Sequence, residues 1–323
     1  MKGADTVLAF LIEAAQRGEK TALVTLTDVE GGASRAIGAQ MAVGITGRYA
    51  GSLSSGCVER AVVGEAQRII GGGRTERVRF GTGSRYIDIR LPCGGAMDLL
   101  FTPAPPLSVL QKANRQLAAR QSVSLELGLD GSIRLAAEES PTGWANNGFI
   151  IRHDPALRIV IVGHGAETTA LAFQARLYGA SVQVLSPDTE LVAKLRSEGI
   201  AAEHLLTPSA SQHMTADRHS AIVFLFHDHD WETALLAQAL DQPAFFVGAM
   251  GSRATHRQRC ALLADAGVSP AAIARIQGPL GIIQAARDPD TLALSALAQI
   301  VADYRNGLDT APMDLAAHQA ETA

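Results

Sequence analysis

The stretch from Leu157 to Asp188 constrains the fold more than any other part of the chain. It reads LRIVIVGHGAETTALAFQARLYGASVQVLSPD: an apolar run, a glycine turn, an amphipathic segment, a second glycine and another apolar run. This order is typical of a strand–helix–strand unit with parallel strands and a right-handed crossover. Apolar runs at 220–226 and 244–248 resemble strands that are covered on both faces. We therefore predict a Rossmann-like, doubly wound parallel sheet in this part of the chain.

The preceding half has a different pattern, which predicts a separate domain of mixed α/β type. Helical spacing of apolar residues predicts helices over 4–17, 58–70 and 109–119. A polar segment at 138–148, rich in Gly, Pro and Asn, separates the two halves. We predict an N-terminal domain at 1–150, a Rossmann-like domain at 151–308 and a patternless, disordered tail at 309–323. Strands are expected at 21–29, 39–45, 76–80, 86–90, 97–101, 122–128 and 132–136.

Composition excludes several classes of protein. A net charge of −4 gives no general basis for binding nucleic acid or an anionic membrane. No apolar run is long enough to cross a bilayer. The first residues, MKGADTVLAFLIEAAQRGEK, are amphipathic and lack the apolar core of a signal peptide. Three cysteines are too few for a disulfide framework, so we expect a cytoplasmic protein.

Three glycine-rich loops in the first half each carry a candidate functional side chain. These are Arg35 in GGASRAIGAQM, Cys57 in GSLSSGCVE and Cys93 in LPCGG. Cys57 stands where a helix is predicted to begin, and a helix N-terminus lowers a thiol pKa, which favours a nucleophile or a soft-metal ligand. Neighbouring Gly and Ser backbone N–H groups could cradle an anion. The alternative is an inert buried cysteine, which suits Cys260, in the middle of a predicted helix, better than Cys57.

The second half contains a partial dinucleotide-binding fingerprint. Gly163 and Gly165 fit its first two glycines, but Thr168 stands at the third position. Ser186 replaces the acidic residue expected after the second strand, and Asp188 follows two residues later. A Rossmann turn needs such glycines for its own geometry, so we do not expect NAD(P) as the working cofactor. An NAD(P)-dependent oxidoreductase stays the alternative function.

Two further stretches combine ionisable residues with strand ends. VGAMGSRATHRQR (247–259) places Ser252, Arg253 and His256 after Gly251, an arrangement that suits an anion-binding turn as well as a solvated basic face. FHDHDWE (226–232) offers imidazoles and carboxylates, which suit a metal-dependent hydrolase. Adjacent residues rarely converge on one ion, so for FHDHDWE we favour a helix cap and loop anchor.

Taken together, these motifs resemble the xanthine dehydrogenase accessory protein family, XdhC/CoxI. The resemblance spans nearly the whole chain in the family's order. The Gly-Cys-Val-Glu and Ser-Arg-x-x-His stretches are its specific parts, whereas the G-x-G alone is not. It is carried by GGASRAIGAQMAV, GSLSSGCVERAVVGEA, RYIDIRLPCGGAMDLLFTP, RIVIVGHGAE, FHDHDWETALLAQAL, VGAMGSRATHRQR and RIQGPLGIIQAARDPDTLALSALAQIVA.

The resemblance implies a molybdenum cofactor chaperone without catalytic residues. Such a protein binds molybdopterin-bound molybdenum, protects it while a cysteine desulfurase supplies sulfide, and delivers it to an apo xanthine dehydrogenase or related molybdenum hydroxylase. A homodimer is expected from the family, and Cys57 is the implied contact to Mo or its sulfide. The implied cofactor-binding set is Cys57, Arg35, Ser55, Gly56, Glu59, Arg85, Cys93, Gly94, Gly163, Gly165, Gly251, Ser252, Arg253 and His256.

One motif departs from the family. GIIQAA at 281–286 stands where the family commonly has Gly-Leu-Asp-Ile-Gly-Ala, so Ile283 occupies the acidic position and Ala285 the glycine position. This departure favours a scaffold or docking role for the C-terminal half. A protein that only docks the dehydrogenase is a further alternative.

Overall fold

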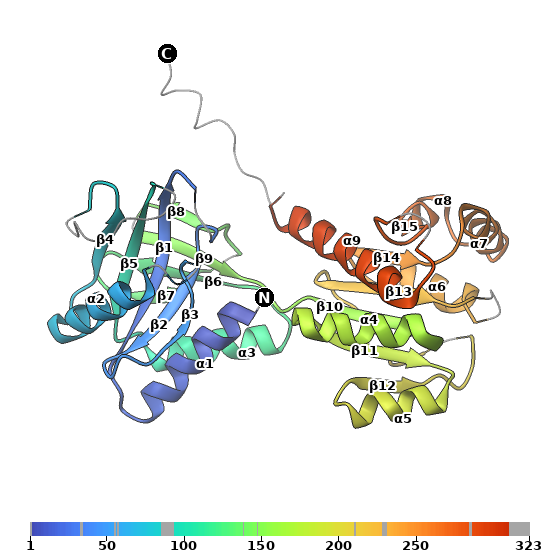
Figure 1. Ribbon diagram of the computed structural model, residues 1–323, viewed down its shortest axis with the longest axis horizontal. Helices are drawn as coiled ribbons and strands as arrows, with labels where there is room; N and C mark the ends of the chain where they lie inside the picture. The colour runs from blue at the N-terminus through green and yellow to red at the C-terminus, as the bar shows by residue number, and fades with distance from the viewer. Residues whose placement is uncertain are drawn as a thin grey trace, which may run out of the picture. The chain divides into compact units, whose positions relative to one another are not determined.

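The computed structural model describes residues 2–32, 35–54, 56, 58–84, 94–137, 139–146, 148–209, 211–227, 231–283 and 286–309. The chain divides into two compact units, Met1–Pro155 and Ala156–Ala323 (Figure 1). The predicted domain boundary at 150 falls inside strand β9 (Gly148–His153), which pairs with β6 (Val123–Gly128) of the first unit. The predictions for Ser55, Cys57, Arg85, the strand at 86–90, Cys93, 228–230, 284–285 and the tail at 310–323 lie outside the described residues.

The first unit is built on a five-stranded antiparallel sheet, called sheet A. Its β-branched and apolar segments form strands near the predicted positions. In space the strands follow the order β3-β2-β1-β5-β4. Their bounds are β1 (Thr21–Glu30), β2 (Gln40–Gly44), β3 (Tyr49–Gly51), β4 (Glu76–Gly81) and β5 (Ala96–Pro103).

Sheet A is covered on both faces. Helix α2 (Glu59–Gly72) packs on the face that carries Val24 and Leu26. The opposite face, which carries Leu23 and Leu100, packs on a shared core with α1, α3 and a second antiparallel sheet of order β7-β6-β9-β8. The bounds of these elements are α1 (Lys2–Gln16), α3 (Leu107–Ala118), β7 (Ile133–Leu135) and β8 (Gly143–Ala145).

The second unit is a six-stranded parallel sheet whose order is β12-β11-β10-β13-β14-β15. Counted along this unit, that order is third, second, first, fourth, fifth, sixth, which is the arrangement of dinucleotide-binding Rossmann folds. The predicted fold class is therefore confirmed. The strands are β10 (Arg158–Gly163), β11 (Ser181–Ser186), β12 (Ala201–His204), β13 (Ser220–Leu225), β14 (Phe246–Ala249) and β15 (Ile276–Gln277).

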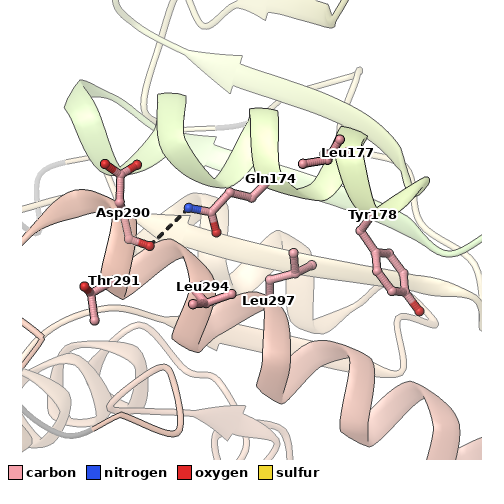
Figure 2. Close-up of a pocket in the computed structure, with 7 residues that line it drawn as sticks. All are labelled: Gln174, Leu177, Tyr178, Asp290, Thr291, Leu294 and Leu297. Atoms are coloured by element: carbon pink, nitrogen blue, oxygen red, sulfur yellow. Dashed lines mark hydrogen bonds between the residues drawn. The ribbon is translucent and has the colours of Figure 1, made fainter.

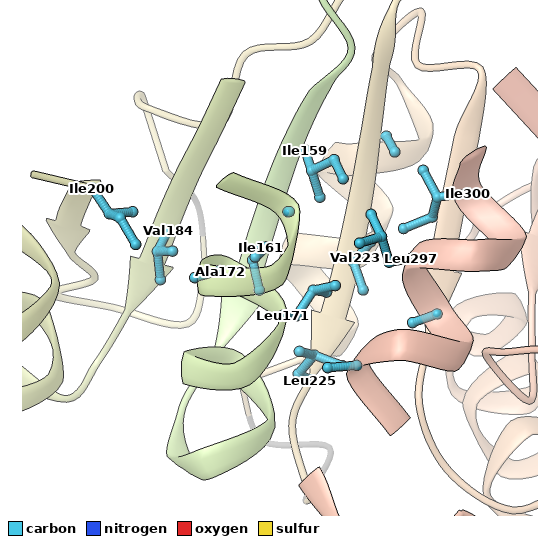
Figure 3. Packing of buried hydrophobic residues seen from close by; sticks show 14 of the residues in the cluster. Ile159, Ile161, Leu171, Ala172, Val184, Ile200, Val223, Leu225, Leu297 and Ile300 are labelled. Carbon is cyan, nitrogen blue, oxygen red and sulfur yellow. The ribbon is translucent and has the colours of Figure 1, made fainter. Parts of the chain in front are cut away.

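Helices cover both faces of the parallel sheet. On one face, Ile161 and Val223 belong to a core with Leu171 of α4 and Leu297 of α9 (Figure 3), and α5 packs against β11 and β12 in the same core. Val160, Ile222 and Phe224 of the other face pack against α6 and α7. The helices are α4 (Gly165–Tyr178), α5 (Thr189–Ser197), α6 (Thr233–Leu240), α7 (Arg253–Asp265), α8 (Pro270–Ile273) and α9 (Pro289–Asp309).

Helix α9 lies beside α4. Gln174 on α4 donates from Nε2 to the Asp290 carbonyl oxygen at 3.1 Å, and Leu294 and Leu297 face the same seam (Figure 2). This contact joins the start of α9 to α4. None of the helices in the described part of the chain is both long and apolar enough to cross a membrane.

Candidate functional site

The register of sheet A brings its glycine-rich loops to one end of the sheet. Ala96, where β5 begins, pairs with both Glu30 at the end of β1 and Gly81 at the end of β4. Gly51, where β3 ends, pairs with Met41 at the start of β2. The loops at 31–39, 52–58 and 82–95 therefore leave the sheet from the same end. These are the three loops that carry Arg35, Gly56 and Gly94 of the predicted cofactor-binding set.

The second of these loops, called here the Ser52–Glu59 loop, is held together by its own side chains. The Glu59 carboxylate accepts from the Ser54 backbone N–H at 2.9 Å and from the Ser54 hydroxyl at 2.6 Å. The Ser52 hydroxyl lies 3.1 Å from the same carboxylate and 2.6 Å from the Ser54 carbonyl oxygen. Leu53 and Val58 anchor the loop in the α2 core. Ser52, Leu53, Ser54 and Val58 are therefore tied to the start of helix α2.

The Ser54 hydroxyl also accepts hydrogen bonds from backbone N–H groups of the loop. Its hydroxyl oxygen accepts from the Gly56 N–H at 3.2 Å and, at a longer 3.4 Å, from the Val58 N–H. The N–H groups of Ser54, Gly56 and Val58 are thus directed inward. The sequence predicts an anion cradle from the Gly and Ser N–H groups beside Cys57, and the N–H groups of Ser54 and Gly56 bond within the loop instead.

Glu59 is ionised in this setting although it is only 7% exposed. Burial by itself raises the pKa of Glu59, but the hydrogen bonds from the Ser54 hydroxyl, the Ser54 backbone and the Ser52 hydroxyl outweigh it. The net pKa lies below the ordinary glutamate value of 4.5. Glu59 is therefore buried within the loop instead of facing a ligand.

Arg35 and the roots of the third loop complete this end of the sheet. Arg35 donates from Nη2 to the Ser52 hydroxyl at 3.4 Å, so the first loop contacts the second. The Thr82 hydroxyl donates to the Gly94 carbonyl at 3.0 Å. A side chain at Gly95 would come within 2.2 Å of the Glu30 carbonyl oxygen, because the roots of the first and third loops touch there.

An ion-pair network beneath these roots was missed by sequence reasoning. Arg79 donates to the Thr82 carbonyl at 2.9 Å, pairs with Asp98 at 3.2 Å and contacts Glu30. Arg77 pairs with Asp98 as well, also at 3.2 Å. The alternation of arginine in ERVRFG (76–81) was the available signal, since it places both arginines on one face of β4.

In the second unit, a cavity of about 790 Å³ lies at the carboxyl ends of the parallel strands. Ligands of open α/β sheets bind in this position. Its lining comes from α4, from the residues after β13, β14 and β15, and from the start of α9. The polar residues that line it include Glu167, His227, Ser252, Arg253, Arg287 and Asp288. A smaller cavity of about 450 Å³ between α4 and α9 is mostly apolar and contains none of the predicted site residues (Figure 2).

The charges in the larger cavity differ in how they are paired. The Glu167 carboxylate faces His227 at 3.7 Å. Asp288 accepts from the Thr291 N–H at 2.8 Å, so it caps α9. Within the described part of the chain, Arg253 and Arg287 make no ion pair or hydrogen bond with another residue. The guanidinium groups of Arg253 and Arg287 are therefore the positive charges of the cavity lining that no described residue pairs with. Arg287 was not among the predicted site residues.

The predicted glycines and His256 of this unit have specific structural settings. A side chain at Gly163 would lie 2.6 Å from the Leu225 carbonyl oxygen, so close strand packing already requires that glycine. At Gly165 it would lie 3.5 Å from a Glu167 carboxylate oxygen. His256 is turned toward Gly278 and away from the cavity lining, and Cys260 Sγ lies 3.7 Å from its Nε2. Burial, aided by Arg259, lowers the pKa of His256.

The metal interpretation of FHDHDWE has little support in the part of the chain that can be described. No group of three or more His, Cys, Asp or Glu residues there is arranged to hold an ion. His227 has Glu167 beside it, and His229 lies outside the described residues.

Comparison with known proteins identifies the chain's relatives. Residues 14–81 match the XdhC and CoxI family, and residues 159–300 match the XdhC Rossmann domain. The molybdenum cofactor insertion chaperone PaoD of Escherichia coli is 36% identical over 300 residues, which cover 91% of this chain and 87% of PaoD. The chain belongs to the XdhC/CoxI family. The predicted resemblance is confirmed.

Two other similar proteins accompany this XdhC/CoxI assignment. The uncharacterized E. coli protein YqeB is 27% identical over 193 residues, covering 56% of this chain and 34% of YqeB. A crystal structure of a xanthine dehydrogenase from Bacillus halodurans superposes with a TM-score of 0.74 at 20% identity, covering 93% of this chain and 96% of that one. At that identity the superposition supports the fold of this XdhC/CoxI member.

Proposed function

We propose that this protein binds molybdenum cofactor as cargo and delivers it to an apo molybdoenzyme, with no turnover of its own. The observation that carries the proposal is the meeting of three glycine-rich loops at one end of sheet A, one of them built around the segment that contains Cys57. The relation to PaoD, which is named a molybdenum cofactor insertion chaperone, supports the same function.

The chemistry of the loop residues suits such a cargo. A cysteine thiolate is a soft ligand, which matches molybdenum and its sulfide. Cys57 lies between Gly56 and Val58, both of which the Ser52–Glu59 loop holds through Ser54. Arg35, which contacts that loop, is a cation suited to the cargo's phosphate, and Arg85, Cys93 and Gly94 belong to the third loop of the same proposal. Ser55 and Gly56, which precede Cys57 in the sequence, belong to the same proposal.

The finer steps belong to the same proposal. The cargo is protected while a cysteine desulfurase replaces an oxo ligand with sulfide, and the acceptor is a xanthine dehydrogenase-type hydroxylase. We propose a cytoplasmic location, which the sparse cysteines favour, and a homodimer.

NAD(P) is not part of the proposed function. Ser186 at the end of β11 is fully buried and carries no charge for a ribose hydroxyl. Asp188 accepts from the Glu190 and Leu191 N–H groups at 2.9 and 3.0 Å, so its carboxylate caps α5. We propose instead that the cavity of the second unit receives an anionic group at Gly251, Ser252 and Arg253, with Arg287 as a second cation.

Cargo retention by cysteine variants tests the proposed function. Wild type, Cys57→Ser and Cys260→Ser are incubated with isolated molybdenum cofactor, gel-filtered and analysed for Mo and oxidised pterin. Cys260 lies on α7 of the second unit, so Cys260→Ser is the matched control. We expect the control to retain cargo like wild type and Cys57→Ser to lose about tenfold or more.

Two outcomes would contradict parts of this proposal. Wild-type protein that retains neither Mo nor pterin would overturn cargo binding itself. Cys57→Ser protein that retains cargo like wild type would remove the role given to Cys57 while leaving cargo binding in place.

A further inference from the structure

We infer that Glu59 is a positioning residue, not a cargo ligand: with Ser54 it holds Gly56 and Val58, which flank Cys57 in the sequence, and withdraws the N–H groups of Ser54, Gly56 and Val58 from anions. This inference deepens the proposed function and rests on it for the identity of the cargo. It reassigns Glu59, which the family resemblance places among the cofactor-binding residues.

The geometry leaves Glu59 little capacity for a ligand. Oxygen Oε1 accepts from the Ser54 N–H at 2.9 Å and lies 3.1 Å from the Ser52 hydroxyl, while Oε2 accepts from the Ser54 hydroxyl at 2.6 Å. The residue is 7% exposed, so a ligand would have to displace the loop to reach it. Charge-assisted hydrogen bonds of this kind are stronger than those between neutral groups.

The same contacts decide which part of a cargo the loop can recognise. A loop that binds phosphate directs several backbone N–H groups outward. Here the N–H groups of Ser54, Gly56 and Val58 point to Glu59 or to the Ser54 hydroxyl oxygen. A buried carboxylate also disfavours an anion beside it. These three N–H groups of the Ser52–Glu59 loop are therefore not available to an anion, and we expect the anionic parts of the cargo to bind elsewhere.

Ser54 links the carboxylate to the two residues that flank Cys57. Its hydroxyl donates to Glu59 and accepts from Gly56 and Val58, so removal of either side chain breaks the same chain of bonds. Removal of both the Glu59 and the Ser54 side chains should then change amide exchange and cargo retention no more than removal of one. Such a non-additive effect is the signature of coupled residues. A side chain that only filled space would give additive effects.

The experiment compares Glu59→Ala, Glu59→Gln, Ser54→Ala and the double Ala variant with wild type. The matched control is Glu65→Ala, because Glu65 is a buried glutamate on the same helix that pairs with Arg68 at 2.7 Å, away from the loop. Two readouts are taken: hydrogen exchange of the 52–58 amides, and retention of Mo and pterin. Glu59→Gln guards against misfolding, since its amide oxygen can still accept a bond from Ser54.

We expect exchange at Gly56 and Val58 to rise about tenfold or more in Glu59→Ala, in Ser54→Ala and, to the same extent, in the double variant. Cargo retention should fall in parallel, with Glu59→Gln intermediate. Glu65→Ala should lower thermal stability but keep wild-type exchange in the loop and wild-type cargo retention. Millimolar phosphate should leave the exchange of the wild-type loop unchanged.

Three results would overturn the inference. One is wild-type exchange and cargo retention in Glu59→Ala. Another is additive loss in the double variant. The third is protection of the Gly56 and Val58 amides by phosphate, which would make the loop an anion site. Hydrogen exchange needs no cargo, so failure of the proposed function would be seen separately, as absent Mo retention in wild type.

Discussion

Helices α2 and α4 begin in the same way, yet their first-turn glutamates do different things. Each helix follows a glycine-containing loop, lacks a side-chain hydrogen bond at its N-cap and carries one acid in its first turn, Glu59 or Glu167. Glu59 is buried and bonded to its own loop. The Glu167 side chain is 20% exposed and faces His227, which follows a different strand, at 3.7 Å.

The difference lies in the loops and not in the helices. The loop before α2 supplies Ser52 and Ser54, whose hydroxyls can donate to a carboxylate that turns back. The turn before α4 is Gly-His-Gly, which offers no hydroxyl, so Glu167 stays in the cavity. A glycine loop followed by a first-turn acid therefore predicts a closed, self-bonded loop only when hydroxyl residues stand before the helix.

The largest effect that tests this comparison is expected at Gly163. Gly163→Ala places a Cβ against the Leu225 carbonyl oxygen at 2.6 Å, and neither strand can move easily, so the second unit should lose about 2 kcal/mol. Gly56→Ala meets no atom within 4 Å and costs only the strain of a positive φ of 103°, about 1 kcal/mol in the first unit.

Urea unfolding followed by tryptophan fluorescence separates the two units. Trp144 lies in the first unit and Trp231 in the second, so a Trp→Phe change at either one leaves a reporter for the other. We argue that strand packing requires Gly163, whereas only backbone conformation requires Gly56. Equal losses of unfolding free energy in Gly163→Ala and Gly56→Ala would refute this distinction.

Sequence patterns were sufficient for the fold because hydrophobic periodicity records burial directly. They did not predict β9, β12 or β15, nor β8, a three-residue strand inside a polar segment. Its Trp144 is held by contacts distant in sequence, with Asp28 at 2.9 Å through Nε1, with Phe149 and with Arg77. Local propensity is weak in so short a strand, and tertiary contacts decide it.

For the candidate site, motifs located residues but not the direction of their bonds. Glu59 and Gly56 stand in one predicted motif, but the hydrogen-bond partner of each depends on the backbone conformation of the loop. His256 follows Arg253 on α7, and its contact with Gly278 depends on packing that the sequence does not encode locally. Arg287 was passed over because it stands in an irregular segment before α9.

A smaller effect is expected on anion binding, which should occur in the cavity of the second unit and not at the Ser52–Glu59 loop. Arg253→Ala should weaken binding of pyrophosphate about tenfold, because it removes an uncommitted guanidinium from the cavity lining. Arg257→Ala, an exposed arginine on the same helix that does not line the cavity, is the control. Calorimetric titration of wild type and both variants with pyrophosphate measures the change in affinity. Pyrophosphate binding that both variants retain, or that wild type lacks, would remove the anion site assigned to Arg253.

The smallest expected effect is the pH dependence of the closed loop. Because hydrogen bonding outweighs burial, the pKa of Glu59 is lowered from 4.5 in the folded protein. The unfolded chain therefore binds a proton first, and the stability that ionised Glu59 contributes is complete above pH 4.5 and is lost as pH falls through the folded pKa. Glu59→Gln cannot titrate, so its stability deficit relative to wild type should shrink below pH 4.5.

A second group in the same unit also titrates in acid and must be separated from Glu59. Burial lowers the pKa of His153 to about 4, only partly offset by Asp154, so this neutral histidine costs stability as pH falls from 6.5 toward 4. Wild type and Glu59→Gln share that loss, and it cancels in their difference. Unfolding both proteins at pH 7, 5 and 4 with Trp144 as reporter isolates Glu59. A deficit that stays constant or grows in acid would mean that Glu59 is not held as a carboxylate, and the loop would then be as open as the cavity around Glu167.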